Sequence, residues 1–363
     1  MDLRSIHDPL RDDVLAGVAE LLESGAFVNG VQVGEFERAF ADACGVREAV
    51  GLASGLDALR LGLVALGLEP GDEVVIPAQT FVATAEAVVQ AGGVPVLADV
   101  DAESACLDPA AADAAVTPRT RIVVPVHLFG RLANMDAMQG VAERHGIRIL
   151  EDAAQAHGVT RDGVPAGAYG AAAAFSFYPA KNLGALGDAG ALVTHDSAIA
   201  ETVRSLREHG QSEKYRHELV GWTARLDTLQ ALVLSLKLPC LDGWNSERRA
   251  AARRYAELLT GLGDLVLPAD DGEAHVWHLY VVRTADPEGL AAHLRELGVA
   301  TGRHYPVPVH LNDAFASLGH REGAFPVAEA WARECLSLPM FPGISDAQLE
   351  TVAEGIRAWF DRG

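Results

Sequence analysis

One lysine stands out among the residues that could do chemistry. Lys181 lies in the stretch SFYPAKNLGALGDAG, residues 176–190, where it follows a predicted strand and precedes a glycine-rich turn. The chain has only three lysines, Lys181, Lys214 and Lys237, among 29 lysines and arginines. A guanidinium cannot replace an amine as a nucleophile, and an apolar site lowers an amine's pKa. The pattern therefore favours imine formation at Lys181 over a solvated lysine on a flexible loop.

A carboxylate is predicted to face an aromatic nitrogen at the end of another strand. Asp152 ends the predicted strand of ILEDAAQAHG, residues 149–158. A buried carboxylate there could keep a pyridinium nitrogen protonated, so that the ring acts as an electron sink. Gln155 would lie on the same side if the chain turns helical after Asp152. Taken alone, an aspartate at this position is more often a cap or a loop residue.

Other strand ends offer an anion site and a flat surface. Gly55 and Leu56 begin a predicted helix in GLASGLDAL, residues 51–59, where free N–H groups and the helix dipole suit a phosphate. Ser176 could add a hydroxyl donor to the same phosphate. Phe81, in PAQTFVAT, could stack on a heteroaromatic ring, with core packing as an equal alternative.

Short, nearly continuous apolar runs alternate with amphipathic segments from about residue 48, which is typical of a parallel sheet covered on both faces. The predicted strands lie in residues 48–53, 73–78, 94–100, 121–130, 148–154, 171–179 and 190–195. Helices are expected from Gly55, Val82, Pro109, Asn134 and Ala198. At the N-terminus Asp8 is expected to cap a helix that has Pro9 in its first turn and ends at Gly25.

The second part of the chain is predicted to be helical first and mixed later. Helices are expected over 226–238, 242–262, 287–297 and 346–360, with HVWHLYVVRT (275–284) between the second and third. We predict an α/β fold with a mostly parallel, doubly wound sheet in residues 1–240 and a smaller α/β domain in residues 241–363. Ligands of such sheets bind beyond the carboxyl ends of the strands. The groups expected to converge there are Ser54-Gly55, Thr80-Phe81, His127, Asp152 with Gln155, and Ser176 with Lys181.

Composition narrows the function classes. The net charge of −21 argues against a nucleic-acid partner. The four cysteines show no metal spacing, so we expect reduced, mostly buried thiols and no metal site. With no apolar signal stretch and no run of about 18 apolar residues, no membrane association is expected and the cytoplasm is the predicted compartment.

Eight stretches occur together in order: SGLDAL, PAQTFVAT, VPVHLFG, EDAAQAHG, SFYPAKNLGALGDAG, RLDTLQA, TGRHYPVPVH and LSLPMFP. In combination they closely resemble the DegT/DnrJ/EryC1/StrS family of aminotransferases that use pyridoxal 5′-phosphate and act on sugars. The resemblance covers nearly the whole chain. It implies fold type I, the pyridoxal phosphate cofactor, and a homodimer with active sites shared between subunits.

The resemblance also implies roles for individual residues. Lys181 resembles the Schiff-base lysine, Asp152 the partner of the ring nitrogen, and Gln155 the residue near the ring hydroxyl. Phe81 resembles the stacking aromatic, and the phosphate cradle corresponds to Gly55, Leu56 and Ser176. Contacts to the sugar correspond to Tyr178, His304 and Tyr305.

Two further positions concern the neighbouring subunit. Lys214, in HGQSEKYRH, resembles a cation for the nucleotide diphosphate, with an ordinary solvated lysine as an equal alternative. Members of the family usually have Asn in GxNxRLD, and this Asn reaches the cofactor phosphate across the dimer. Here the segment is GWTARLD, with Thr223 at that place. Its shorter hydroxyl predicts a contact that is weaker, mediated by water, or absent.

The expected reaction is a ping-pong transamination from an amino acid, with L-glutamate favoured, to a nucleotide-linked keto sugar. The stretch NLGALGDAG resembles the corresponding sequence of enzymes that act on dTDP-linked 3-keto-6-deoxyhexoses in antibiotic sugar biosynthesis. A 4-keto sugar, or an aminocyclitol with glutamine as donor, is the alternative. A nicotinamide oxidoreductase should carry a GxGxxG fingerprint, which is missing. A non-catalytic binding or regulatory protein is disfavoured because Lys181, Asp152 and Gln155 are all kept.

Overall fold

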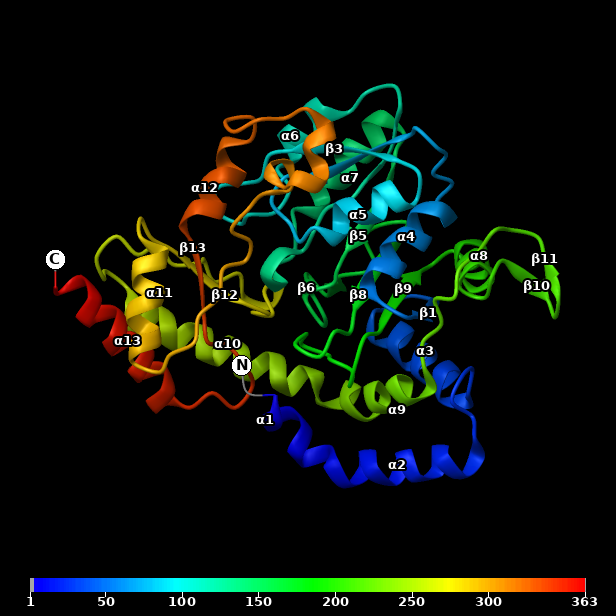
Figure 1. Ribbon diagram of the computed structural model, residues 1–363, viewed down its shortest axis with the longest axis horizontal. Coiled ribbons are helices and arrows are strands. Elements are labelled where there is room, and N and C mark those ends of the chain that lie inside the picture. The colour runs from blue at the N-terminus through cyan, green and yellow to red at the C-terminus, as the bar shows by residue number, and fades with distance from the viewer. Residues whose placement is uncertain (1–2, 363) are drawn as a thin grey trace.

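The structure is a computed structural model that describes residues 3–362 (Figure 1). The N-terminal segment forms α1 (Arg4–His7), a 3-10 turn (Asp8–Leu10) and α2 (Arg11–Ser24). Gly25 ends α2 with φ 69°, as predicted. The prediction that Asp8 caps the helix is wrong. The chain is already helical at Asp8 (φ −58°, ψ −40°), whereas an N-cap residue needs an extended backbone.

A seven-stranded sheet forms the centre of the molecule, in the order β1-β9-β8-β5-β4-β2-β3. Only β9 runs antiparallel to its neighbours, so the sheet is mostly parallel, as predicted. Every residue of β2 and β9 is buried, because both faces of the sheet are covered. The strands are β1 (Glu48–Leu52), β2 (Glu73–Pro77), β3 (Val94–Ala98), β4 (Thr120–Val123), β5 (Arg148–Asp152), β8 (Ala172–Ser176) and β9 (Gly190–Thr194).

Helices connect and cover these strands. The helix α4 packs so closely on the sheet that a Cβ at Gly62 would lie 2.7 Å from Leu192 of β9. The crossover helices are α4 (Gly55–Ala65), α5 (Ala83–Gln90), α6 (Pro109–Ala115) and α7 (Met135–His145). The helix α8 (Ser197–Arg207) follows β9, the last strand of the sheet along the chain. Two further helices, α3 (Val31–Ala43) and α9 (Thr228–Lys237), pack against each other, and α3 also packs on β1.

The second part of the chain builds its own hydrophobic cluster around Tyr255, Trp277 and Tyr280. The helix α9 leads through a 3-10 turn into the long helix α10 (Leu241–Leu259), so the two predicted helices are nearly continuous. The remaining elements are β12 (Tyr280–Arg283), α11 (Pro287–Glu296), α12 (Pro326–Glu334), β13 (Cys335–Leu338) and α13 (Asp346–Phe360). The strands β12 and β13 pair antiparallel, and α11 and α13 lie beside α10 at the end of the molecule opposite α8 (Figure 1).

Two small hairpins complete the fold. One consists of β6 (Thr160–Arg161) and β7 (Val164–Pro165). The other, β10 (Gln211–Glu213) with β11 (Arg216–His217), extends away from the sheet beside α8 (Figure 1). Tyr215 at its turn is 83% exposed and Val220 just after it is 91% exposed. This hairpin therefore presents apolar side chains outside the core of its own chain.

The structure also describes the four cysteines and the apolar character of the helices. All four cysteines are free, and Cys44, Cys106 and Cys335 are buried. Among residues 3–362, no helix combines the length and apolar character needed to cross a membrane.

Candidate active site

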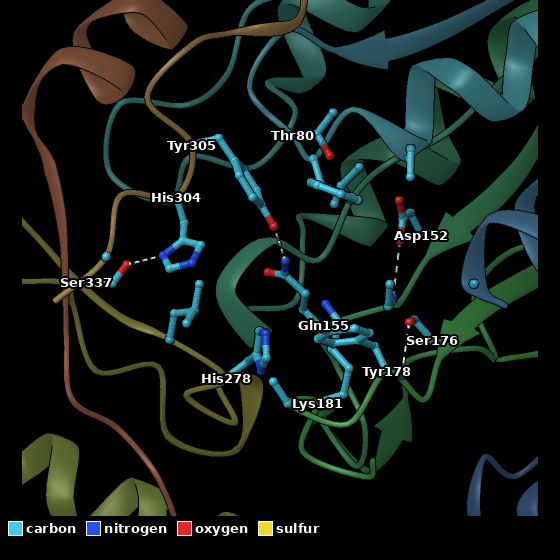
Figure 2. A pocket seen from close by; sticks show the side chains of 18 of the residues that line it. Thr80, Asp152, Gln155, Ser176, Tyr178, Lys181, His278, His304, Tyr305 and Ser337 are labelled. Carbon is cyan, nitrogen blue, oxygen red and sulfur yellow. Dashed lines mark hydrogen bonds between the residues drawn. The ribbon is translucent and has the colours of Figure 1, made fainter. Parts of the chain in front are cut away.

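A cavity of about 650 Å³ opens at the carboxyl ends of the central strands, where the fold class predicted a ligand site (Figure 2). The sheet supplies one wall, and the segments around His278, His304 and Ser337 supply the opposite wall. The predicted site residues that line the cavity are Gly55, Leu56, Phe81, Asp152, Gln155, Ser176, Tyr178, Lys181, His304 and Tyr305. Side chains from β5, from the loop after β8 and from residues 304–305 thus face one space, as Figure 2 shows.

Lys181 and Asp152 are the two charged groups that give the cavity its chemistry. Burial lowers the pKa of Lys181 to about 8, although Asp152 acts in the opposite direction. Roughly a tenth of the amine is therefore unprotonated at pH 7, far more than for an ordinary lysine, and is available as a nucleophile. Burial likewise raises the pKa of Asp152 above its usual range. A carboxylate in this state gains from any cationic nitrogen brought next to it.

Two threonines orient the carboxylate of Asp152. The Thr84 hydroxyl donates to Oδ2 of Asp152 at 2.8 Å, and the Ala154 N–H donates to Oδ1 at 3.2 Å. The Thr84 hydroxyl has one proton and donates it to Asp152. The 3.0 Å contact between the Oγ1 atoms of Thr80 and Thr84 must therefore be a hydrogen bond donated by Thr80. The resulting chain Thr80–Thr84–Asp152 favours the ionised carboxylate, in opposition to burial.

Gln155 links the sheet wall to the opposite wall. Its Oε1 accepts from the Phe129 N–H at 2.6 Å, and its Nε2 donates to the Tyr305 hydroxyl at 3.0 Å. The backbone contact fixes which end of the amide is the donor. Phe81 is 52% exposed and lies 5.4 Å from the Tyr305 ring between centroids. A ring half open to the cavity is available for stacking on a ligand, which core packing would not allow.

The start of α4 forms an anion cradle with the end of β8. The Ser54 side chain caps the helix by accepting from the Asp57 N–H, which leaves the N–H groups of Gly55 and Leu56 without an acceptor inside the helix. A Cβ at Gly55 would lie 2.6 Å from the Cβ of Ser176. Only glycine therefore lets the helix start approach the Ser176 hydroxyl, and the three donors suit a phosphate.

The loop that carries Lys181 is held from behind by another lysine. The Lys181 N–H donates to the Tyr178 carbonyl at 2.8 Å, and the Ala185 N–H donates to the Phe177 carbonyl at 2.8 Å. The Nζ of Lys237, which is fully buried, donates to the Gly184 carbonyl and contacts Nε2 of His7 at 2.9 Å. These contacts close the loop around Lys181 and tie it to the N-terminal segment.

Three residues that were expected at or near the site lie elsewhere in this chain. The prediction for His127 is wrong: it is fully buried, and its Nε2 contacts Glu151 at 3.0 Å. Thr223 contacts Nε2 of His209 at 3.1 Å, and Lys214 lies 5.3 Å from the Tyr215 ring centroid. Neither Thr223 nor Lys214 lines the cavity of its own chain.

Sequence reasoning missed several residues of the cavity, among them Thr84, His278 and Ser337. Thr84 follows Phe81 by three residues at the start of α5, so a helical reading of PAQTFVAT would have placed it near the same strand end. The side chain of Ser337 contacts Nδ1 of His304 at 2.7 Å. His278 and Ser337 lie beside or within short strands whose pairing joins segments about 60 residues apart, and no local pattern predicts that contact.

The residues present fit a ligand with an aldehyde, a ring nitrogen and a phosphate. Lys181 offers an amine with a lowered pKa, Asp152 a buried carboxylate, and the Gly55–Ser176 cradle its donors. Phe81 adds a half-exposed aromatic ring to the lining of the same cavity. Pyridoxal phosphate carries these three groups on one flat ring, so the cavity matches it feature by feature.

Comparison with known proteins agrees with this geometry. The model of the DegT/DnrJ/EryC1/StrS aminotransferase family matches residues 9–357. The chain is 45% identical over 363 residues to dTDP-3-amino-3,4,6-trideoxy-alpha-D-glucose transaminase of Streptomyces venezuelae, covering 100% of this chain and 96% of the relative.

Solved structures show the same arrangement of the whole chain. The crystal structure of S. venezuelae DesV superposes with a TM-score of 0.97 at 45% identity, covering 100% of this chain and 98% of that one. The structure of NtdA from Bacillus subtilis, with bound cofactor PMP, superposes with a TM-score of 0.93 at 30% identity, covering 99% and 84%. The chain therefore belongs to the DegT/DnrJ/EryC1/StrS aminotransferase family.

Proposed function

We propose that this protein is a pyridoxal-phosphate aminotransferase that moves an amino group from L-glutamate to a dTDP-linked 3-keto deoxysugar. The observation that carries the proposal is that one cavity holds both Lys181, an amine with a lowered pKa, and Asp152, a buried carboxylate. When bound, the cofactor would supply an electron sink that stabilises negative charge on the substrate carbon. The protein supplies binding, orientation and proton transfer.

Each side chain of the cavity has a distinct part in this proposal. Asp152, held by Thr84, keeps a proton on the ring nitrogen. Gly55, Leu56 and Ser176 hold the phosphate, while Phe81 covers one face of the ring. The Nζ of Lys181 would hold the cofactor and, once displaced by the donor, would carry a proton away from the donor carbon and later deliver one to the acceptor carbon. Tyr178, His304 and Tyr305 would contact the sugar.

The choice of substrate rests on the relatives. The S. venezuelae relative is named for a dTDP-3-amino sugar product, and it is similar to this chain over its whole length. The cavity agrees with a neutral sugar ring, because its lining outside Lys181, Asp152 and Asp188 consists of uncharged groups at neutral pH. Burial and Lys181 lower the pKa of His304, so that side chain is also neutral there.

We propose further that the enzyme is a homodimer whose subunits complete each other's sites. Within the cavity described here, Lys181 is the only cationic side chain among the lining residues, which leaves no arginine or second lysine for a diphosphate or a carboxylate. Lys214 and Thr223 lie on or next to the exposed hairpin segment, where Tyr215 and Val220 offer apolar surface to a partner. A second copy would bring Lys214 to the nucleotide and Thr223 toward the cofactor phosphate.

The division into two domains near residue 240 is part of the same proposal. Two hydrophobic clusters support it, one around the large sheet and one around α10, α11 and α13. Residues 309–335 nevertheless pack on the first cluster, so the segment after β12 crosses back to the large domain. The cavity lies where the two parts meet.

Donor and acceptor tests separate the levels of this proposal. Protein loaded with pyridoxal phosphate should be yellow, lose its visible band when L-glutamate is added, and regain it when a dTDP-3-keto-6-deoxyhexose follows. Initial rates against both substrates should give parallel reciprocal plots. If the visible band returned only with a dTDP-4-keto sugar or a keto-cyclitol, that compound class would replace the 3-keto sugar as the acceptor. Coloured protein that reacts with no amino acid would contradict the transaminase function.

A further inference from the structure

The orientation of one buried asparagine can be read without ambiguity. The Nδ2 of Asn182 lies 2.9 Å from the backbone carbonyl of Val276 and 2.9 Å from Oδ1 of Asn245. A carbonyl oxygen only accepts hydrogen bonds, so the nitrogen of the Asn182 amide must face Val276. The Nδ2 of Asn245 in turn donates to the His157 carbonyl at 2.8 Å, which fixes the second amide in the same way. Both side chains are at most 2% exposed.

This fixed amide determines the tautomer of His278. The Oδ1 of Asn182 lies 3.2 Å from Nδ1 of His278, and an amide oxygen only accepts. Nδ1 must therefore carry the proton and donate it. In a neutral ring, Nε2 is then an unprotonated acceptor. His278 lines the cavity, and residues 3–362 provide no hydrogen-bond partner for Nε2.

The surroundings keep the ring neutral. Burial lowers the pKa of His278 well below its usual value, and Lys181, Arg248, His157 and His304 add to the effect. These groups come from the lysine loop, from α10, from the segment after β5 and from the opposite wall of the cavity. No carboxylate is among them, so nothing nearby favours the imidazolium form.

The backbone next to His278 is also held in place. Trp277 has φ 49°, a left-handed conformation that is unfavourable for a bulky residue. The Nη1 of Arg248, itself 2% exposed, donates to the carbonyls of Trp277 at 3.0 Å and His278 at 3.3 Å. The Trp277 ring stacks on His275 with centroids 3.8 Å apart. Strain of this kind persists where surrounding contacts fix a side chain for use.

Lys181 is the cationic donor among the residues that line the cavity. Lys181 directly precedes Asn182, and the side chain of Asn182 holds the imidazole of His278 by the hydrogen bond to Nδ1. In Figure 2 the imidazole lies beside Lys181 at the lower edge of the cavity. The carboxylate of Asp152 accepts hydrogen bonds from Thr84 and Ala154.

We propose that the free ε-amine of Lys181, which is not hydrogen-bonded to His278 in this structure, turns to Nε2 of His278 as its acceptor when it is not bonded to a ligand. The inference rests on the proposed function in taking Lys181 as the reactive amine. A neutral acceptor that takes one N–H of the amine leaves the nitrogen lone pair free and fixes its direction. A carboxylate at this position would instead retain the ammonium form. His278 is thus a positioning residue for the proton-transferring lysine.

The tautomer is measured directly on the cofactor-free protein by two-bond ¹H–¹⁵N NMR with labelled histidine. The His278→Asn variant identifies the His278 signals, because they disappear from its spectrum. We expect a neutral ring with the proton on Nδ1 throughout pH 6 to 8.5. A proton on Nε2, or an imidazolium signal within this range, would overturn the proposal.

The contact with Lys181 is measured by competitive acetylation of the same cofactor-free protein across pH, followed by peptide mapping. The three lysines fall in separate segments, and an added model amine serves as the internal standard. His278→Asn keeps a donor for Asn182 and removes the acceptor at Nε2. Loss of a charge-assisted hydrogen bond should lower the pKa of Lys181 by about 0.5 to 1 unit. His304→Asn, on the opposite wall, is the matched control and should leave it unchanged.

An unchanged pKa of Lys181 in His278→Asn, or an equal shift in both variants, would contradict the contact. Neither experiment uses colour or turnover. A protein that failed to react with glutamate would therefore count against the proposed function alone, while the NMR and labelling results would decide the role of His278.

Discussion

The hydroxyl of Thr84 provides the sharpest test of how the site maintains its charge. Asp152 accepts two hydrogen bonds, from Thr84 at 2.8 Å and from the Ala154 N–H at 3.2 Å, while burial raises its pKa. Thr84→Val keeps the shape of the side chain and removes the shorter bond. The change therefore favours the protonated carboxyl and disfavours the carboxylate that the ring nitrogen needs.

The size of the effect follows from the two charge states. A hydrogen bond to an ionised group contributes about 1.5 to 3 kcal/mol, and one to a neutral acid contributes about 1 kcal/mol. The difference of about 0.5 to 2 kcal/mol corresponds to a rise of about 0.4 to 1.5 units in the pKa of Asp152. Cofactor binding that requires the carboxylate is present above this pKa and is lost as pH falls through it. In a plot of cofactor affinity against pH, the acid limb (the loss of affinity at low pH) should therefore move to higher pH by the same amount.

The assay is a titration of cofactor-free protein with pyridoxal phosphate, followed by visible absorbance from pH 5 to 9. The titrations of the ligand and of Lys181 are common to both proteins, so the difference between the two curves isolates Asp152. The affinities of variant and wild type should converge at the alkaline end. Thr80→Val is the matched control: it removes the outer hydroxyl but leaves the bond from Thr84 to Asp152, and its limb should move by less than about 0.5 unit. Coincident acid limbs for Thr84→Val and wild type would refute the reasoning.

Two further predictions concern the phosphate cradle and the support of the sheet. Gly55→Ala would place a Cβ 2.6 Å from the Cβ of Ser176, so pyridoxal phosphate should bind about tenfold more weakly or worse, while pyridoxal, which lacks the phosphate, should bind as it does to wild type. An equal loss for both ligands in absorbance titrations would argue against a phosphate at this helix start. Glu151→Ala should lower the free energy of unfolding in urea by about 3 to 5 kcal/mol, because buried Glu151 accepts from His127 and from the N–H groups of Gly167, Tyr169 and Gly170. The control Glu48→Ala breaks a partly exposed pair with Arg204 and a long hydrogen bond from the Ser197 hydroxyl. It should cost about 0 to 1 kcal/mol, so equal losses would contradict a special role for Glu151.

Local patterns predicted the elements and the strand ends well. The apolar runs are the strands, the turn after β8 carries Lys181, and Gly55 begins α4, because each depends on residues close in sequence. Convergence of these ends into one cavity followed from parallel topology. Asp8 was misread because its capping role required the chain before it to be extended, and α1 makes it helical.

Contacts between segments that lie far apart in the sequence could not be predicted from local patterns. His127 lies four residues after the end of β4, where its two ring nitrogens contact Glu151 and the Ala133 N–H, and it does not line the cavity. The scarcity of lysine also did not separate two roles. Lys181 and Lys237 both have their pKa lowered to about 8 by burial, yet only Lys181 lines the cavity, while Lys237 holds the loop from behind. In the sequence the place of Lys181 after a strand distinguished it, and the role of Lys237 became visible only in the packed fold.

The most direct test of the account is to reduce pyridoxal-phosphate-loaded protein with borohydride and map the modified peptide. The chain has three lysines, so the outcome is unambiguous. The account predicts one stable adduct, on the peptide that contains Lys181. An adduct on the peptide of Lys214 or Lys237, or none in protein that retains the cofactor, would contradict it.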